Sequence, residues 1–456
     1  MKRFLNLFFC LFAALSLWAV TPSDTLTLAQ LEDALREDPG RAGGTKLNYP
    51  FGPYSVAPAP KGYKPFYISH YGRHGARFAT QAAKYDAVAK LFTTGHDKGA
   101  LTEKGEDFYH RYMEIYPLLK GHEGDLTEKG QEQHRELARR MVAAYPSVFR
   151  KAPRVDARAT VSPRAIISMM SFCDELRVER PRVDIQYAAN HTDLPVTALR
   201  PTPEQAEASR IKSYGDIFKG EDFTNGMAAA ARSIGLDEKA FFLRYFKDLE
   251  VVKECGSPRE SMNAMDEVVT NLQNLDFNVD LGDVFTEEER FKLFESGNLY
   301  AVLMFQDNPY SKGLMSARAW PLLQDIIDRA DEDIASGQMQ ARLRFGHDTV
   351  VGPLMALLGI DGWTALGADM TRWKYWFQGW NIPMASNLQF VFYRNKKNPS
   401  DILVRLMYNE KDQILPLPDQ SLAPYYRWSD FETWYKPICE RAKAFIDEFL
   451  FGEESL

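Results

Sequence analysis

Residues 67–78, YISHYGRHGARF, constrain the fold of this chain more than any other stretch. Apolar, β-favouring residues lead to two glycines, Gly72 and Gly75, which interrupt the pattern. Glycine tolerates backbone conformations that other residues avoid, and at Gly75 it also permits a ligand to approach the backbone closely. The stretch therefore predicts a strand over residues 66–70 that leads into a turn.

Three basic side chains, Arg73, His74 and Arg77, lie within this turn. Two guanidinium groups beside an imidazole disfavour its protonated form, which keeps the histidine neutral and nucleophilic. Their forked donors also match the oxygens of a phosphate dianion. A basic surface turn is the alternative, but R-H-G-x-R arises by chance in roughly one chain of this length in several hundred. We therefore interpret the turn as an anion-binding site with a nucleophilic histidine.

A further arginine occurs at the predicted start of a helix. Residues 157–172, ARATVSPRAIISMMSF, predict a short strand followed by a helix that begins near Ser162-Pro163, because proline fits the first helical position. Arg164 then falls in the first turn, where a cation opposes the helix dipole. A bound anion would be attracted by both the helix end and the arginine. Arg164 is thus a second candidate for anion binding, the alternative being an exposed surface arginine.

A histidine–aspartate pair, His347 and Asp348, follows a late strand signal. Residues 343–345 alternate as in a strand, Gly346 follows, and the apolar run GPLMALLGI indicates a helix soon after. The pair is therefore expected at the carboxyl end of a strand, where open α/β sheets place their ligand sites. A His-Asp pair alone is a weak signal, and its weight comes from the R-H-G-x-R turn earlier in the chain.

These motifs resemble the histidine phosphatase superfamily, in its acid phosphatase and phytase branch. The resemblance covers most of the chain after residue 20, in the family's order. It implies a phosphomonoester hydrolase that forms a phosphohistidine, with no metal and no organic cofactor. The roles it implies are a nucleophile and a general acid, His74 and Asp348, and four groups that hold the phosphoryl oxygens: Arg73, Arg77, Arg164 and His347.

The chain differs from related patterns at two points. Ala79 stands where the branch usually has proline, which should cost loop rigidity and no chemistry. The related multiple inositol polyphosphate phosphatases carry H-A-E, whereas here Asp348 directly follows His347. The resemblance implies small-molecule phosphomonoester substrates, such as inositol phosphates or sugar phosphates, and leaves the individual substrate open. The alternatives are a non-catalytic phospho-ligand binding protein on the same fold and a phosphomutase, which an export signal disfavours.

The predicted fold is α/β, with a mixed, mostly parallel sheet flanked by helices and a helical cap insertion. Residues 180–300 show few strand signals and are assigned to the cap, and residues 21–179 and 301–456 to the α/β core. Residues 21–65, rich in proline, glycine and polar side chains, are expected to form an arm over the surface. Thr102, Thr127 and the pair Thr286 and Glu289 predict helix starts. Residues 388–410 predict an antiparallel hairpin.

Residues 1–20, MKRFLNLFFCLFAALSLWAV, have the layout of a secretory signal. Two basic residues precede a long apolar run, which predicts export to the periplasm or outside the cell; an uncleaved anchor is the alternative. No later stretch predicts a membrane span. A net charge of −7 disfavours nucleic acid as the main partner.

Three cysteines remain after residue 20: Cys173, Cys255 and Cys439. They permit at most one disulfide within the chain, and their spacing matches no metal site. The oligomeric state and the signal cleavage point stay open.

Overall fold

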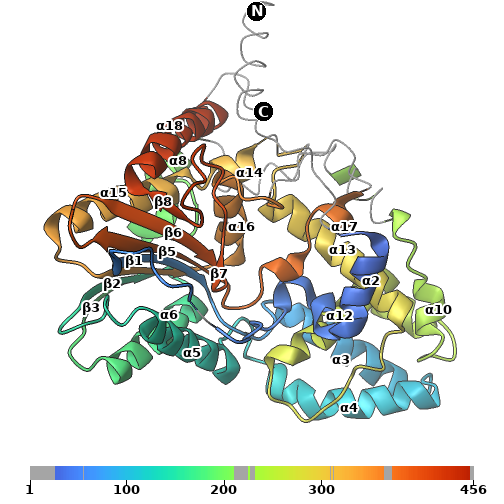
Figure 1. Ribbon diagram of the computed structural model, residues 1–456. Coiled ribbons are helices and arrows are strands. Elements are labelled where there is room, and N and C mark those ends of the chain that lie inside the picture. The colour runs from blue at the N-terminus through green and yellow to red at the C-terminus, as the bar shows by residue number, and fades with distance from the viewer. Residues whose placement is uncertain are drawn as a thin grey trace, which may run out of the picture.

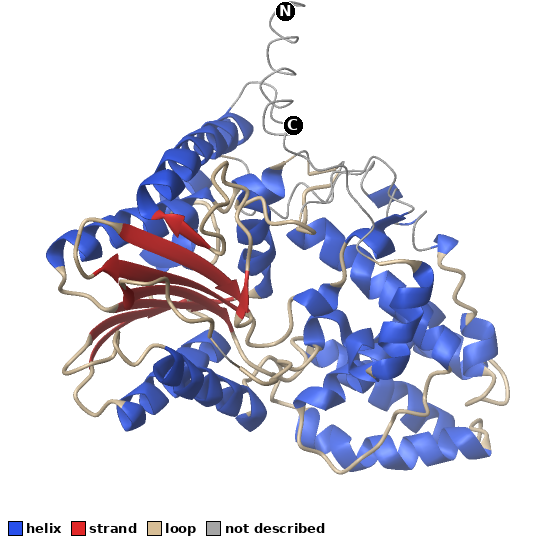
Figure 2. Cartoon of the chain, in the orientation of Figure 1, coloured by secondary structure: helices blue, strands red, loops and turns tan. Residues whose placement is uncertain are grey.

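The computed structural model describes residues 26–54, 56–209, 224–225, 228, 232–308, 310–311, 313–363 and 372–451. A sheet with helices on both faces forms one part of the molecule, and helices alone form the other (Figures 1 and 2). The predicted signal segment lies outside the described residues. No helix within the described ranges is long and apolar enough to cross a membrane.

The sheet has the strand order β3-β2-β4-β1-β5-β6-β7, with β8 paired to β6. Strands β3, β2, β4 and β1 run parallel to one another. The pairs β1–β5, β5–β6, β6–β7 and β6–β8 are antiparallel. The prediction of a mixed α/β sheet flanked by helices is therefore confirmed. The strands are β1 (Tyr63–Arg73), β2 (Arg154–Ala159), β3 (Asp184–Ala188), β4 (Ala341–Gly346), β5 (Asn387–Asn395), β6 (Ile402–Tyr408), β7 (Lys411–Asp412) and β8 (Tyr425–Arg427).

Two groups of long helices cover the sheet (Figure 1). On one face, α5 (Glu128–Ala144) and α6 (Pro163–Glu179) pack their apolar side chains against the strands. On the other face lie α15 (Trp320–Ser336), α16 (Asp348–Leu357) and α18 (Trp428–Phe451). The central strands are consequently buried on both faces, as expected for parallel strands covered by helices.

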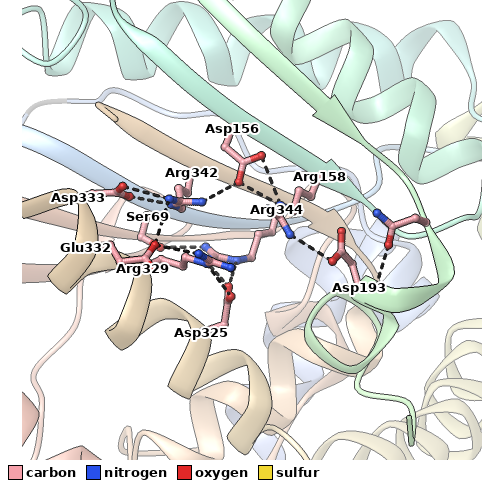
Figure 3. Close-up of polar contacts among 11 residues, drawn as sticks. Ser69, Asp156, Arg158, Asp193, Asp325, Arg329, Glu332, Asp333, Arg342 and Arg344 are labelled. Carbon is pink, nitrogen blue, oxygen red and sulfur yellow. Dashed lines mark hydrogen bonds and ion pairs between the residues drawn. The ribbon is translucent and has the colours of Figure 1, made fainter. Parts of the chain in front are cut away.

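Ion pairs join α15 to the sheet (Figure 3). On β4, Arg342 contacts Asp333 of α15 at 2.7 Å and Asp156 of β2 at 2.9 Å. Two residues further along, Arg344 contacts Asp325 of α15 at 2.5 Å. Charged groups removed from water need such partners, because an unpaired buried charge costs several kcal/mol. The network fixes β4 against α15 close to the end of the strand that carries the His-Asp pair.

The helical part is built around α3 (Ala82–Asp97), which packs against α4 (Glu103–Leu119) and α12 (Pro258–Asn271). The remaining described helices are α2 (Leu28–Glu37), η1 (Pro39–Lys46), η2 (His191–Asp193), α7 (Leu194–Thr197), α8 (Pro203–Ala208), α10 (Glu238–Phe242), α11 (Glu250–Cys255), η4 (Leu272–Asn274), α13 (Glu287–Phe305), α14 (Leu314–Ala317), α17 (Trp373–Trp376) and η6 (Gly379–Asn381).

The predicted helix starts agree with the structure. Thr102 and Thr127 accept hydrogen bonds from backbone N–H groups three residues later, at 3.2 and 3.1 Å. Thr286 and Glu289 form the expected capping box at the start of α13. Each of these signals acts within one turn of helix, so it depends little on the rest of the fold.

Two features differ from the sequence-based division of the chain. The strand β3, within the stretch assigned to the cap, pairs with β2 in the sheet. The helix α3, within the stretch assigned to the core, packs with α11 and α12 in the helical part, and α4 packs against α3. Strand pairing and helix docking are contacts between distant residues, and local composition does not reveal them. The cap boundaries therefore remain a prediction.

The expected surface arm is wrong for part of the N-terminal region. Leu31, Leu47 and Tyr49 are buried, and η1 packs against α12, α13 and η6. Met384 donates its backbone N–H to the carbonyl of Leu47 at 2.8 Å. Because η1 has a proline and three glycines and makes many of its contacts through the backbone, its sequence shows no apolar periodicity that would have indicated burial.

Candidate active site

The ends of β1 and β4 bring the two main motifs together. Arg73 on β1 is in register with Gly346 on β4, and His74 donates its backbone N–H to the Gly346 carbonyl at 2.9 Å. On the other side, Ala385 donates to the carbonyl of His74 at 2.9 Å. The R-H-G-x-R turn is thus held next to the His-Asp pair, at the carboxyl ends of parallel strands, where the sequence placed it.

His74 is buried and has one free ring nitrogen. Its Nδ1 lies 2.9 Å from the carbonyl of Gly75, so the ring proton is on Nδ1 and the lone pair is on Nε2. Burial lowers the pKa of His74 well below its usual value, and the charges of Arg73 and then Arg77 lower it further. The imidazole is therefore neutral in mildly acid and neutral solution, as a nucleophile requires.

Glycine is required at position 75 by a close contact with the backbone of α5, whereas the approach of a ligand was expected. A Cβ at Gly75 would lie 2.3 Å from the carbonyl oxygen of Gly130, at the start of α5. The reverse holds for Gly130, where a Cβ would lie 2.2 Å from the carbonyl of Ala76. Only glycine fits at such separations.

Arg73 is fully buried, and three separate segments hold it. Its Nη1 donates to the carbonyls of Thr45 at 2.5 Å and Ile382 at 2.8 Å, and its Nη2 donates to Asp348 Oδ2 at 2.7 Å. Burial lowers the pKa of Arg73 to about 10, so the guanidinium stays charged at neutral pH. Its orientation is fixed before any ligand binds.

Arg77 and Arg164 approach the same place from different elements. Burial lowers the pKa of Arg164, and the charge of Arg77 lowers it further. The Nε–H groups of Arg73, Arg77 and Arg164 are all buried and have no hydrogen-bond partner among the described residues. Buried donors are seldom left unpaired. Three of them in one cluster indicate a site for an anion.

His347 lies beside His74, with their ring centroids 5.6 Å apart. Its backbone N–H donates to the hydroxyl of Tyr71 at 3.1 Å, and its Nε2 lies 3.2 Å from Thr160 Oγ1. The Thr160 hydroxyl already accepts a hydrogen bond from the Ser162 N–H at 3.4 Å, so it can donate its own proton to His347 Nε2. Burial, with the charge of Arg164, lowers the pKa of His347 to about 4. The ring is neutral and can present its Nδ1–H as a donor.

Asp348 is the first residue of α16 and pairs with Arg73. Its Oδ1 accepts the backbone N–H of Thr349 at 2.9 Å, and its Oδ2 accepts from Arg73. Burial alone would raise the pKa of Asp348, but the positive charge of Arg73, above all, holds it below its usual value. The carboxyl group is therefore ionised in this arrangement.

All six predicted residues thus meet at one end of the sheet. The amino-acid sequence matches the family model of the histidine phosphatase superfamily, branch 2, over residues 72–186 and 249–409, which is more than half of the chain. The chain belongs to this superfamily. The resemblance read from the motifs is confirmed, and the protein is a phosphomonoester hydrolase of the histidine acid phosphatase type.

Named relatives of this histidine phosphatase include multiple inositol polyphosphate phosphatase 1 of Homo sapiens. It is 24% identical over 417 residues, which cover 82% of this chain and 81% of the relative. Among solved structures, the multiple inositol polyphosphate phosphatase of Bifidobacterium longum, in complex with inositol hexasulfate, aligns with a TM-score of 0.69 at 17% identity, covering 85% of this chain and 96% of that one. The phytase of D. castellii aligns with a TM-score of 0.59 at 15% identity, covering 89% and 85%.

Several contacts that shape the phosphatase site left no signal in the sequence. The carbonyls of Thr45 and Ile382, which orient Arg73, belong to the backbone, and any residue type supplies a carbonyl. Ala79, where the branch usually has proline, donates its N–H to the hydroxyl of Tyr85 at 2.7 Å. Proline has no N–H and could not make this bond. At position 79, the hydrogen bond to Tyr85 therefore restrains the loop in place of a proline ring.

The described part of the phosphatase holds no group of three or more histidine, cysteine, aspartate or glutamate side chains placed to bind a metal ion. Cys173, Cys255 and Cys439 are free thiols. Trp363, Trp373 and Trp376 are buried.

Proposed function

We propose that this phosphatase transfers the phosphoryl group of a monoester first to His74 and then to water. The observation that carries the proposal is the state of His74, a neutral imidazole with its lone pair on Nε2 beside three guanidinium groups. In the first step Nε2 attacks phosphorus, an N–P bond forms and the P–O bond to the leaving group breaks. Arg73, Arg77 and Arg164 stabilise the negative oxygens as charge redistributes during transfer.

Asp348 supplies the proton for the leaving oxygen. Its pairing with Arg73 keeps it ionised without substrate, so the proton must become available when the ester binds. A phosphate monoester has a second pKa of about 6 and carries a proton in mildly acid solution. The bound phosphate also offsets the positive charge of Arg73 and adds negative charge nearby, and both effects raise the pKa of Asp348. The proton can then pass through Asp348 to the leaving oxygen.

The second step reverses the role of Asp348. Having lost its proton, the carboxylate accepts one from a water molecule that attacks the phosphohistidine. The N–P bond breaks, inorganic phosphate forms, and His74 regains its neutral state. Asp348 must therefore be protonated in the first step and ionised in the second, which requires a pKa near the working pH and favours activity in acid solution.

We infer that the substrates are phosphorylated polyols or sugars, with inositol polyphosphates as the first to test. The support is the similarity to proteins named multiple inositol polyphosphate phosphatase, over most of both chains. Export to the periplasm or outside the cell is a further proposal, and it rests on the basic and apolar pattern of residues 1–20.

The decisive experiment replaces the nucleophile. His74→Ala should remain folded, by circular dichroism and thermal melting, and lose turnover on every phosphomonoester. Brief reaction of the wild type with labelled substrate, followed by digestion and mass spectrometry, should place phosphate on His74. Label on a serine or aspartate would contradict the mechanism. Binding without turnover by the wild type, across a panel of monoesters, would favour the non-catalytic alternative.

A further inference from the structure

A basic pocket lies at the opposite end of the sheet from the phosphate site. Strands β1, β2 and β3 begin there, on the side of the sheet away from the helical part (Figure 1). His74 directly follows β1, which has 11 residues, and a strand rises about 3.3 Å per residue, so roughly 30 Å separate the pocket from the nucleophile. One small ligand cannot occupy both places. The pocket has a volume of about 630 Å³, and five of its nine lining residues are cations: Lys64, Arg150, Lys151, Arg180 and Arg182.

The backbone around the pocket is fixed by contacts between its segments. Ser147, in the connection between α5 and β2, donates its hydroxyl to the carbonyl of Pro65 on β1 at 2.6 Å. Phe149 lines the pocket and is fully buried in the core beneath it. Asp184 donates its backbone N–H to the carbonyl of Pro153 at 2.8 Å, which joins the segments that precede β2 and β3. The basic side chains therefore extend from a backbone whose shape the fold determines.

The positive charge of the pocket is largely unpaired. No carboxylate is among its lining residues. Four of the five cations, all except Arg180, are exposed, and in the described part of the chain none of these four pairs with a carboxylate. Arg180 is half-buried; its Nη1 donates to the carbonyl of Glu179 at 2.6 Å and lies 3.9 Å from the carboxylate of the same residue. The net charge around the pocket is therefore strongly positive.

Arginines just outside the pocket are paired. On α5, which leads into the pocket, Arg135 contacts Glu128 at 2.6 Å and Arg140 contacts Glu410 at 2.6 Å. The unpaired cations are thus concentrated at the pocket, in a protein whose net charge is −7. A concave surface lined by one sign of charge focuses the electrostatic potential and raises the local concentration of ions of the opposite sign. The pocket is therefore suited to attract an anion.

We propose that this pocket is a second anion site, which binds, without reacting, a small molecule that carries several phosphate or sulfate groups. Its volume lies in the range of small-molecule sites, about 300–1,000 Å³. Three of its cations are arginines, whose forked donors match the oxygens of phosphate and sulfate. A ligand with one anionic group would leave most of the five cations unpaired, whereas a polyanion contacts several together. A soluble polyphosphate ester and a phosphorylated lipid head group share this chemistry.

Calorimetric titration with myo-inositol hexasulfate tests the pocket, because this polyanion has no phosphate ester to be hydrolysed. The pocket variant combines Arg150→Gln, Lys151→Asn and Arg182→Gln; asparagine suits position 151, where φ is 67°. Loss of three charge-assisted contacts should weaken the site at least about a hundredfold, so the wild type should bind about one molecule more per chain than the variant. Hydrogen exchange at residues 146–151 and 180–182 should slow with ligand in the wild type alone. Hydrolysis of glycerol 2-phosphate should be the same in both proteins.

A matched control separates the pocket from net charge. Lys90→Gln, Lys239→Gln and Lys253→Gln, combined, remove three exposed lysines of the helical part and change the net charge by the same amount. This control should keep both the binding and the slowed exchange. An equal loss in the control, or identical binding by the wild type and the pocket variant, would overturn the proposal. The single substitution Arg182→Gln, which should weaken binding about tenfold or more, provides the same comparison if the triple variant does not fold.

Vesicles distinguish the two sources of the ligand. Phosphatidylcholine vesicles that contain phosphatidylinositol bisphosphate are mixed with the wild type and with the pocket variant, and the bound protein is measured by flotation. Flotation of the wild type alone would identify a lipid head group as the ligand. Binding of hexasulfate without flotation would identify a soluble polyanion. Absence of both would overturn the proposal, whereas failure of the wild type to hydrolyse any monoester would contradict the proposed function and leave the pocket unaffected.

Discussion

Replacing Asp348 with asparagine should separate its chemical role from its structural one. Arg73 Nη2 donates to Asp348 Oδ2 at 2.7 Å, and the Thr349 N–H donates to Asp348 Oδ1 at 2.9 Å. Asparagine has one carbonyl oxygen and can keep one of these two hydrogen bonds, so the variant should fold with a modest loss of stability. What it loses is the negative charge and the proton that the carboxyl group transfers.

The expected loss depends on the leaving group. Proton transfer by a positioned acid contributes about 10²–10⁴-fold to a rate, and an alkoxide leaving group depends on it fully. A nitrophenolate is stable without the proton. Hydrolysis of glycerol 2-phosphate by Asp348→Asn should therefore fall by about 10²–10⁴-fold, and that of nitrophenyl phosphate by less than about tenfold.

Binding should change in the opposite direction. The carboxylate competes with phosphate for Arg73, so its neutralisation should tighten inhibition by inorganic phosphate. Steady-state kinetics with phosphate as competitor measure the rate loss on glycerol 2-phosphate, the rate loss on nitrophenyl phosphate and the inhibition constant of phosphate. Equal losses on the two substrates would mean that Asp348 positions phosphate and that the general acid is another residue.

Further predictions follow from single contacts. Arg164→Ala should raise KM and lower kcat in steady-state assays, because the arginine holds oxygens whose charge changes during transfer; unchanged kinetics would return it to a surface role. Gly75→Ala should destabilise the protein by about 1–3 kcal/mol in urea denaturation, since its Cβ would meet the Gly130 backbone, whereas Gly52→Ala, where a Cβ would meet open space, should lose less. The pKa of Asp266, about 6 when folded and usually 3.8, makes the folded state bind its proton more tightly, so stability falls as pH rises between these values. Asp266→Asn should therefore raise the melting temperature above about pH 6 and leave it unchanged below about pH 4; equal gains at both would contradict the assignment.

The parts of the site that the sequence predicted are those defined by short segments. A strand that ends in glycines delivers Arg73 and His74, a helix start delivers Arg164, and a second strand end delivers His347 and Asp348. Each depends on a local rule about turns or helix ends. That they meet is a property of the sheet, whose parallel strands β1, β4 and β2 end at the same edge.

The contacts that the sequence did not predict join residues far apart in the chain. Thr45 and Ile382 reach Arg73 through their carbonyls, and Gly130 fixes the conformation at Gly75 through its backbone. Backbone groups are the same in every residue, so no side-chain pattern marks them. The segment around Thr45 was expected to be a surface arm because it is rich in proline, glycine and polar side chains.

In the mechanism that we propose, the ion pair of Arg73 and Asp348 links substrate binding to the protonation state of the Asp348 carboxyl group. Without phosphate, Arg73 stabilises the ionised carboxylate and so opposes protonation. Once phosphate binds, the guanidinium has a stronger anionic partner, and the carboxylate is left buried beside negative oxygens, where burial and like charge both favour its protonated form. In the proposed mechanism, substrate binding therefore prepares the general acid for the step that needs it. Such coupling explains why a buried carboxylate can pair with an arginine and still serve as a proton donor.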